Sequence, residues 1–247
     1  SMKRFGAIAL AMAVGQLSLW GAGVDGAAWG KKKPKVEAPP PVVNDMQVEG
    51  LVGELEDAAV QRTLQGSHAA MRRCYDEQAG RLHYVGGHIE LKVRVLPSGK
   101  PKWVAIVDSN VGNTEIEQCV VGVLEKTAFP TPKGGEGELT CPIDFAARTP
   151  TGKWAGERIA GVLAKKKAAL HACQGKAKAG TATLDALRMT LYIGPGGAPT
   201  SVGFAAEAPQ DAKVTKCLAD KLLSLQFDDP LGQMVKVDYP LSGLGQK

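Results

Sequence analysis

The sequence lacks the residue patterns that enzymes use for catalysis. Its four histidines occur neither in H-E-x-x-H nor with cysteines at zinc-finger spacing, which argues against a metal site. No serine stands in a nucleophile elbow, and no pair of carboxylates has a matched partner. The glycine-rich stretches lie between expected strands and do not open a helix, as phosphate-binding loops do. We therefore expect a protein that is not an enzyme and holds no metal or cofactor.

Aromatic residues and net charge are also scarce. Phe, Trp and Tyr make up 5% of the chain, the net charge is +5, and the basic residues are not interleaved with aromatic ones. This composition argues against nucleic acid as a partner. No C-x-x-C pair occurs, so thiol–disulfide exchange is not expected. The chain of 247 residues is long enough for two domains of ordinary size.

The first 28 residues have the pattern of a secretory signal peptide. Lys3 and Arg4 precede an apolar run over residues 5–23, and small residues follow at positions 26–28. An uncleaved membrane anchor is the alternative, because about 20 apolar residues can span a bilayer. Four lysines directly after the run would then lie on the far side of the membrane, against the positive-inside tendency. We expect export and cleavage.

Residues 29–48 form a linker rich in lysine and proline. The three consecutive prolines Pro39–Pro41 favour an extended polyproline II conformation and prevent a packed core. Two interpretations stay open. The linker is either a stalk whose lysines contact peptidoglycan or another anionic envelope polymer, or a solvated leader.

Two stretches of the chain match at a constant offset of 98 residues. Residues 89–107 and 187–205 each show strict alternation of apolar and polar residues, then a turn with Pro-x-Gly, then a second strand-like run. Each stretch therefore predicts a β-hairpin. The expected inward-facing positions are Ile89, Leu91, Val93 and Val95 in the first copy and Leu187, Met189, Leu191 and Ile193 in the second.

Each hairpin lies between two expected helices and is followed by a last strand. Thr114 and Glu117 fit a capping box at the start of one helix. The last strands, over 138–145 and 235–242, each contain a proline, which is typical of edge strands or of strand ends. The prediction is an α+β protein of two tandem α-β-β-α-β modules, residues 49–148 and 149–247. Each module has a three-stranded antiparallel sheet covered by two helices.

Four of the five cysteines occupy equivalent places in the two copies. Cys74 lies 45 residues before Cys119, and Cys173 lies 44 residues before Cys217. Each pair joins the two helices that cover one sheet, and an exported protein can form disulfides. A bridge that closes a loop of this length contributes roughly 4 kcal/mol, so we predict both disulfides. Cys141 remains, at an inward strand position where a small buried apolar residue is expected.

The first copy contains five short motifs whose order and spacing can be compared with those of known families. They are Cys-Tyr at 74–75, Pro-Ser-Gly-Lys at 97–100, Gln-Cys-Val at 118–120, Phe-Pro-Thr-Pro at 129–132 and Cys-Pro-Ile-Asp-Phe at 141–145. Their order and spacing resemble the AgmX/PglI C-terminal domain, a TonB-C-terminal-like family known from gliding bacteria. The second copy departs from the pattern, since Phe-Asp-Asp-Pro replaces Phe-Pro-Thr-Pro.

The resemblance implies a periplasmic adaptor or scaffold of an envelope complex, such as gliding, secretion or transport machinery. In TonB-like proteins the last strand takes up an extended peptide of a partner protein by strand addition. The strand positions expected to bind a partner are Leu139, Thr140, Cys141, Ile143 and Phe145 in the first copy and Val235, Val237, Tyr239 and Leu241 in the second. The polar sheet face is the other candidate surface, with Glu90, Lys92 and Arg94 in the first copy and Arg188, Thr190 and Tyr192 in the second.

Two alternatives stay open. A TonB-like energy transducer requires the N-terminal apolar run to remain as an anchor in the inner membrane. A peptidoglycan-associated structural protein is favoured by the lysine-rich linker.

Overall fold

The computed structural model describes residues 53–244, so the expected signal peptide and the linker over 29–48 lie outside the described residues. The described chain is α+β and contains two separate sheets. We call residues 53–149 the N-terminal half and residues 150–244 the C-terminal half. Within residues 53–244, no helix combines the length and the apolar composition needed to cross a membrane.

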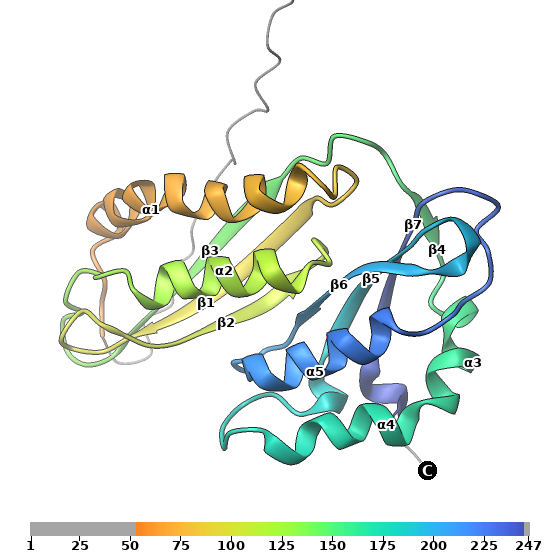
Figure 1. Cartoon of the computed structure of the whole chain (residues 1–247). Helices are drawn as coiled ribbons and strands as arrows, with labels where there is room; N and C mark the ends of the chain where they lie inside the picture. The colour runs from red at the N-terminus through yellow and green to blue at the C-terminus, as the bar shows by residue number, and fades with distance from the viewer. Residues whose placement is uncertain (1–52, 245–247) are drawn as a thin grey trace, which may run out of the picture. The chain divides into compact units, whose positions relative to one another are not determined.

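The N-terminal half follows the predicted order of elements. Its three strands form an antiparallel sheet in the order β2-β1-β3, and both helices lie on the same face of that sheet (Figure 1). The elements are α1 (Asp57–Ala79), β1 (Gly87–Val95), β2 (Pro101–Ser109), α2 (Thr114–Glu125) and β3 (Gly137–Phe145).

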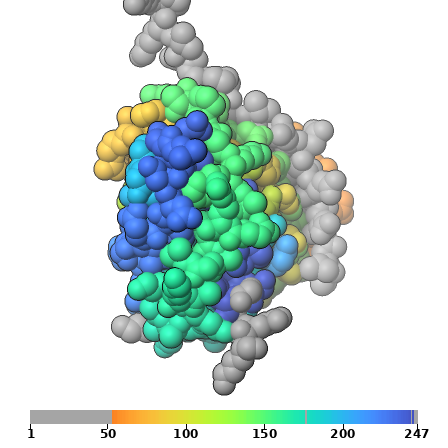
Figure 2. All heavy atoms as spheres, turned by 90° about the vertical axis from the view of Figure 1, so that its right-hand side faces the viewer, coloured from red at the N-terminus to blue at the C-terminus, as the bar shows by residue number. Residues whose placement is uncertain are grey.

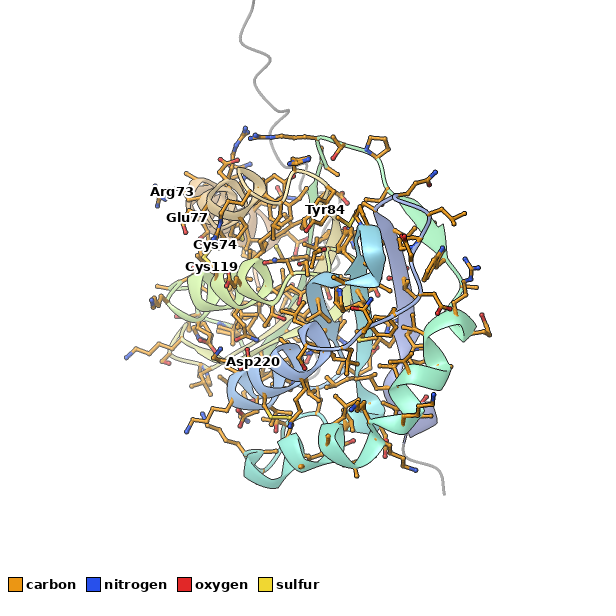
Figure 3. The ribbon with its side chains drawn as sticks, turned by 45° about the vertical axis from the view of Figure 1, so that its right-hand side comes forward. Arg73, Cys74, Glu77, Tyr84, Cys119 and Asp220 are labelled. Carbon is orange, nitrogen blue, oxygen red and sulfur yellow. A yellow bond between two sulfur atoms is a disulfide. The ribbon has the colours of Figure 1, made fainter. Side chains whose placement is uncertain are left out.

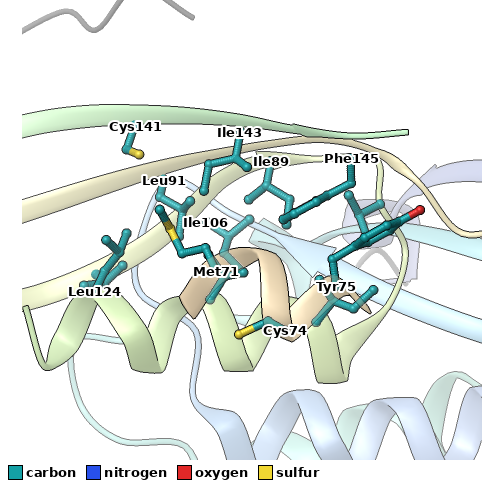
Figure 4. Close-up of a cluster of buried hydrophobic side chains, with 14 of the residues drawn as sticks. Met71, Cys74, Tyr75, Ile89, Leu91, Ile106, Leu124, Cys141, Ile143 and Phe145 are labelled. Carbon is teal, nitrogen blue, oxygen red and sulfur yellow. The ribbon is translucent and has the colours of Figure 1, made fainter. Parts of the chain in front are cut away.

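The core of this half lies between the helices and the sheet. Alternate residues of β1 are buried, as their apolar character predicts. Met71 and Tyr75 of α1 lie near Ile89 and Ile143 of the sheet (Figure 4). The ring of Tyr75 stacks on that of Phe145 with 4.8 Å between centroids. The alternation therefore identified the buried face of the sheet correctly.

The C-terminal half has one strand more than the sequence predicts. Its sheet has the order β4-β7-β5-β6, in which β5 is antiparallel to β6 and β7 while the short β4 is parallel to β7. The expected first helix is divided, because the backbone at Lys166 leaves the helical region (φ −109°, ψ 5°). The elements are β4 (Gly152–Trp154), α3 (Glu157–Lys165), α4 (Lys167–His171), η1 (Ala172–Lys176), η2 (Leu184–Ala186), β5 (Arg188–Ile193), η3 (Pro195–Gly197), β6 (Pro199–Ala205), α5 (Ala212–Leu223), β7 (Val235–Pro240) and η4 (Leu241–Leu244).

The hairpin turns of the two halves have the same local structure. The N–H of Phe129 donates to the carbonyl of Gly99 at 2.8 Å, and Phe227 donates to Gly197 at 3.0 Å. Both glycines have φ +79°, and a β-carbon at either would overlap the carbonyl oxygen of that phenylalanine. Only glycine fits such a position, so the offset of 98 residues in the sequence corresponds to equivalent contacts in the structure.

Both expected disulfides are present. Cys74 and Cys119 join α1 to α2 with 5.6 Å between Cα atoms, and Cys173 and Cys217 join η1 to α5 with 5.7 Å. Figure 3 shows the first pair between its two helices. Cys141 is free and buried in the sheet, and this burial raises the pKa of its thiol to about 12. Its thiol therefore stays protonated at neutral pH.

Candidate partner-binding surface

A strand edge can accept a partner's strand only where its outward main-chain groups are not already bonded. The edge strands are β2 and β3 in the N-terminal sheet and β4 and β6 in the C-terminal sheet.

The outer edge of β6 is covered by side chains of α2. The Thr114 hydroxyl donates to the carbonyl of Val202 at 2.7 Å, and the main-chain N–H of Phe204 donates to the Glu117 carboxyl at 2.8 Å. The expected capping box of Thr114 and Glu117 is therefore wrong. Asn113 is the N-cap, because its side chain accepts from the N–H of Ile116.

The outer edge of β2 meets the end of β6. The carbonyl of Ile106 accepts hydrogen bonds from the N–H of Ala206 at 2.8 Å and from the side-chain amide of Gln210 at 2.9 Å. The N–H of Ile106 donates to the same Gln210 side chain at 3.3 Å. Both edges are thus partly occupied by the contact between the halves.

Glu117 lies at the centre of this contact and is 2% exposed. Its carboxyl also accepts from the Ser109 hydroxyl at 2.8 Å. Burial raises the pKa of Glu117 to about 7, against the opposing effect of hydrogen bonds from Phe204 and Ser109. A β-carbon at Gly203 would overlap the carboxyl group, so the glycine permits this close approach. Sequence reasoning assigned Glu117 to a local cap and missed its role between the halves.

The polar face of the C-terminal sheet is not an open surface, contrary to the prediction. Tyr192 is 1% exposed, and its hydroxyl donates to the carbonyl of Gly86 at 3.2 Å. Thr190 is buried, and Arg188 donates to the Asp108 carboxylate at 2.6 Å. The N-terminal half covers Thr190 and Tyr192, whereas Arg188 stays exposed at the rim of the contact.

β7 is not an edge strand, and Pro240 instead lies at the end of the strand, which is the other position expected for it. β4 runs along the outer side of β7 (Figure 1), where it pairs with Val235, Lys236 and Val237. The residues of β4 and α3 lie at the surface of this half, beside the loop that leads to β7 (Figure 2). Leu241 is buried in η4, after the strand, and Tyr239 is half-buried against the core. β4 thus occupies the first part of the expected binding edge, up to Val237, and does not reach Tyr239.

The outer edge of β3 is paired with no other strand of residues 53–244. The carbonyl and N–H of His88 both bond to Asn110, so even-numbered residues of β1 turn their main-chain groups toward β2. The odd-numbered residues of β1 therefore bond to β3, where they lie opposite odd-numbered residues. The main-chain groups of Thr140 and Pro142 consequently point away from β1, toward the outer edge. A proline at such a position removes no hydrogen bond from the sheet.

The direction of the main-chain groups shows which of the predicted binding residues of β3 can pair with a partner strand. Leu139, Cys141, Ile143 and Phe145 have buried side chains and turn their main-chain groups toward β1. Of the five predicted residues in this strand, Thr140 presents its main-chain groups at the outer edge. The alternation of the sequence identified the buried side chains but could not show that their main-chain groups are also used.

Glu90, Lys92 and Arg94 do lie together, on the sheet face opposite the helices. Arg94 forms a 2.7 Å ion pair with Glu138 of β3, and the Lys92 ammonium lies 3.6 Å from the same carboxylate. In the register, Lys92 is opposite Thr140. Lys92 and Arg94 of the polar face are therefore paired with Glu138 of β3, beside the outer edge of that strand.

A groove between α2 and α5 was not predicted, because the two halves form it together. Its volume is about 550 Å³. Arg81 and Glu115 lie 3.9 Å apart on one side of the groove, and Lys216 and Asp220 lie 3.3 Å apart on α5. Figure 3 labels Asp220 on that helix. The other lining residues are Gln78, Leu82, Asn113, Thr114, Gln118, Thr200, Ser201, Val202, Ala212, Ala219 and Leu223.

Within residues 53–244, no group of three or more His, Cys, Asp or Glu side chains is arranged to hold a metal ion. In comparisons with known proteins, no protein-family model, no curated protein and no solved structure matches this chain.

Proposed function

We propose that this protein is a non-enzymatic periplasmic adaptor of a bacterial envelope complex, built from two tandem TonB-C-terminal-like modules of the AgmX/PglI type. It binds an extended segment of a partner protein along the outer edge of β3. The complex belongs to the class of gliding, secretion or transport machinery that the sequence resemblance implies.

The repeated geometry of the halves supports the tandem modules. The strand order β2-β1-β3 corresponds to β6-β5-β7, and each half has a disulfide between equivalent elements. The turn glycines Gly99 and Gly197 make the same contact with a phenylalanine main chain. A duplication accounts for all three likenesses, and the parallel strand β4 is an addition to the second module.

The two disulfides support an oxidising compartment, because structural disulfides are rare in proteins of the reducing cytosol. The signal-peptide pattern of residues 1–28 agrees with the same location.

One observation carries the proposal, namely that β3 presents a long outer edge. β3 has nine residues, while β4, the edge strand at the far side of the other sheet, has three. β2 and β6 are partly covered by each other's half. Short and covered edges accept strands poorly, so β3 is the best-suited edge of the described chain.

The partner strand would pair most fully beside the first part of β3. The main-chain N–H and carbonyl groups of Glu138 and Thr140 point to the outer edge there. Pro142 lacks an N–H and would interrupt a continuous ladder of hydrogen bonds. Lys92 and Arg94 lie on the adjacent polar face. We therefore expect recognition through main-chain hydrogen bonds, with charged side chains on one face selecting the partner.

The proposal is tested with two substitutions at one position. Thr140→Pro removes the outward N–H, whereas Thr140→Val retains it and changes only the side chain. The tagged full chain is recovered from cell envelopes, and co-purified proteins are quantified by mass spectrometry. A partner bound by strand addition is retained by Thr140→Val and lost with Thr140→Pro, while both variants keep the wild-type circular dichroism spectrum. Equal recovery with both variants would refute edge pairing, and sedimentation with purified peptidoglycan alone would favour the structural alternative.

A further inference from the structure

The described chain begins beside the start of β3. The main chains of Glu54 and Lys133 form an antiparallel bridge with two hydrogen bonds, of 2.8 and 2.9 Å. A β-carbon at Gly53 would lie 2.9 Å from the carbonyl group of Gly135, so the two segments are in close contact there. β3 begins shortly afterwards, at Gly137. The residues that precede Gly53 in the sequence therefore leave the described structure next to the first residues of β3.

The outer edge of β3 is the side on which these preceding residues can pair. On its inner side, β3 pairs with β1 along its whole length, from Gly137 opposite Val95 to Phe145 opposite Gly87. Its outer edge is paired with no other strand of residues 53–244. The bridge at Lys133 is antiparallel, so a chain that extends it backward runs along the outer edge in the direction that antiparallel pairing requires.

The sequence just before Gly53 has the pattern of a short edge strand. Residues 45–49 read Asp-Met-Gln-Val-Glu, which alternates polar and apolar side chains strictly over a common strand length. The prolines at 39–41 would end such a strand on its N-terminal side. These five residues lie outside the described part of the chain, with residues 50–52 between them and Gly53. At about 3.3 Å per residue, this short connection keeps them within reach of β3.

The alternation of residues 45–49 matches the two faces of β3. Opposite residues of an antiparallel pair place their side chains on the same face of the sheet. Extension of the bridge register places Val48 opposite Leu139, which is buried against the helices. The same register places Gln47 opposite Thr140, on the polar face. A shift by one residue would bring the polar side chains onto the buried face, so the pattern favours this register or one shifted by two.

We propose that residues 45–49 pair antiparallel with the first part of β3 as a fourth strand of the N-terminal sheet, which a partner segment must displace. In either favoured register the main-chain groups of Gln47 and Glu49 point toward β3, because these residues lie opposite even-numbered residues of that strand. A nine-residue open edge invites pairing with other chains, and proteins commonly cover such edges.

The two parts of this inference stand on different ground. The strand within the chain requires no partner, whereas the competition rests on the proposed function. A segment joined to β3 by a short connection has a high effective concentration at the edge. A partner then binds only the fraction of molecules whose edge is free, which lowers its apparent affinity by that fraction.

The strand is tested by amide hydrogen exchange of the full chain, measured by NMR at constant pH. The N–H of Thr140 points to the outer edge, and in the wild type it should exchange on the order of 100-fold more slowly than an exposed amide. The double variant Gln47→Pro/Glu49→Pro removes the two N–H groups that point to β3, and should abolish this protection. The matched double variant Gln47→Thr/Glu49→Thr keeps both N–H groups and should retain it.

Three results would overturn the strand. They are exchange of Thr140 as an exposed amide in the wild type, equal protection in both double variants, and protection that falls on dilution, which would assign the edge to a second copy of the chain. A measurement without any variant guards against misfolding of the mutants. Nuclear Overhauser contacts between the main-chain protons of Thr140 and those of Gln47 or Glu49 are expected in the wild type, and their absence would also contradict the pairing.

The competition is tested separately, by recovery of proteins from cell envelopes with the tagged full chain. Gln47→Pro/Glu49→Pro should recover several-fold more of a partner than Gln47→Thr/Glu49→Thr, and equal recovery would refute the competition. A protected Thr140 without any recovered partner would support the strand and refute the proposed function. An unprotected Thr140 with a recovered partner would refute the strand and leave the proposed function standing.

Discussion

The carboxyl group of Glu117 in α2 accepts a 2.8 Å hydrogen bond from the main-chain N–H of Phe204 in β6, 87 residues later in the chain. A side chain of one half thus satisfies a strand edge of the other. This bond, the bond from the Thr114 hydroxyl to Val202 and the bonds at Ile106 together cover part of the outer edges of β2 and β6. The halves therefore form one unit, which leaves β3 as the long edge on which the proposed partner binding depends.

The burial of Glu117 makes the stability of the protein depend on pH. Because the pKa rises from an ordinary value of 4.5 to about 7 on folding, the folded state binds the proton more tightly. This contribution is fully present below pH 4.5 and is lost as the pH rises to 7, by about 3 kcal/mol in total. We expect the free energy of unfolding in urea to fall over this range by about that much more in the wild type than in Glu117→Gln. Parallel pH profiles for the two proteins would contradict this assignment.

The turn glycine Gly197 cannot be replaced by alanine. A β-carbon there would be strained at φ +79° and would overlap the Phe227 carbonyl, so Gly197→Ala should lower the free energy of unfolding by about 3 kcal/mol or more. In the neighbouring variant Gly196→Ala the backbone is strained but the new β-carbon overlaps no atom, so the free energy of unfolding should fall by about 1 kcal/mol. Gly161 lies in α3 with open space around it, so Gly161→Ala should raise the free energy of unfolding by roughly 0.5–1 kcal/mol. Equal losses at positions 196 and 197 in chemical denaturation would show that the overlap is relieved.

Removal of the Cys173–Cys217 disulfide should destabilise the protein by roughly 4 kcal/mol, because the bridge closes a loop of 44 residues. The double variant Cys173→Ala/Cys217→Ala avoids leaving an unpaired thiol. Its free energy of unfolding is compared with that of the wild type under oxidising conditions. A loss below about 1 kcal/mol would mean that packing of η1 on α5 alone holds the C-terminal half together.

Cys141 should be unreactive in the folded protein. Its burial raises the thiol pKa to about 12, so almost no thiolate is present at pH 8. Iodoacetamide should add no mass to the native protein and one adduct to the protein unfolded in guanidinium without reductant. Labelling of the native protein at residue 141 would show that β3 opens readily.

Local patterns of the sequence predicted the parts of the fold that depend on local chemistry. Alternation identified the buried residues of β1, such as Ile89 and Leu91, and matched spacing identified both cysteine pairs. Pro142 correctly indicated an edge strand, because a proline is tolerated where no sheet hydrogen bond is needed.

The parts that sequence reasoning missed depend on contacts between the halves. Tyr192 looks like an exposed polar position, yet it is buried because Gly86 and Tyr84 of the other half lie against it. β4 has three residues, too few to show a strand period, so the sequence did not show that β7 has a neighbouring strand on each side. Glu117 fits a local cap by spacing, and only the packing of α2 on β6 gives it a partner 87 residues away.

Photo-crosslinking at Thr140 in living cells tests partner binding at β3 most directly. A photoreactive amino acid is placed at residue 140 and, as a control, at the exposed Gln65 of α1. Adducts are identified by mass spectrometry. We expect one discrete protein adduct from position 140 and none from position 65. Absence of an adduct at position 140, equal labelling from both positions, or adducts with cell-wall material alone would contradict strand addition at β3.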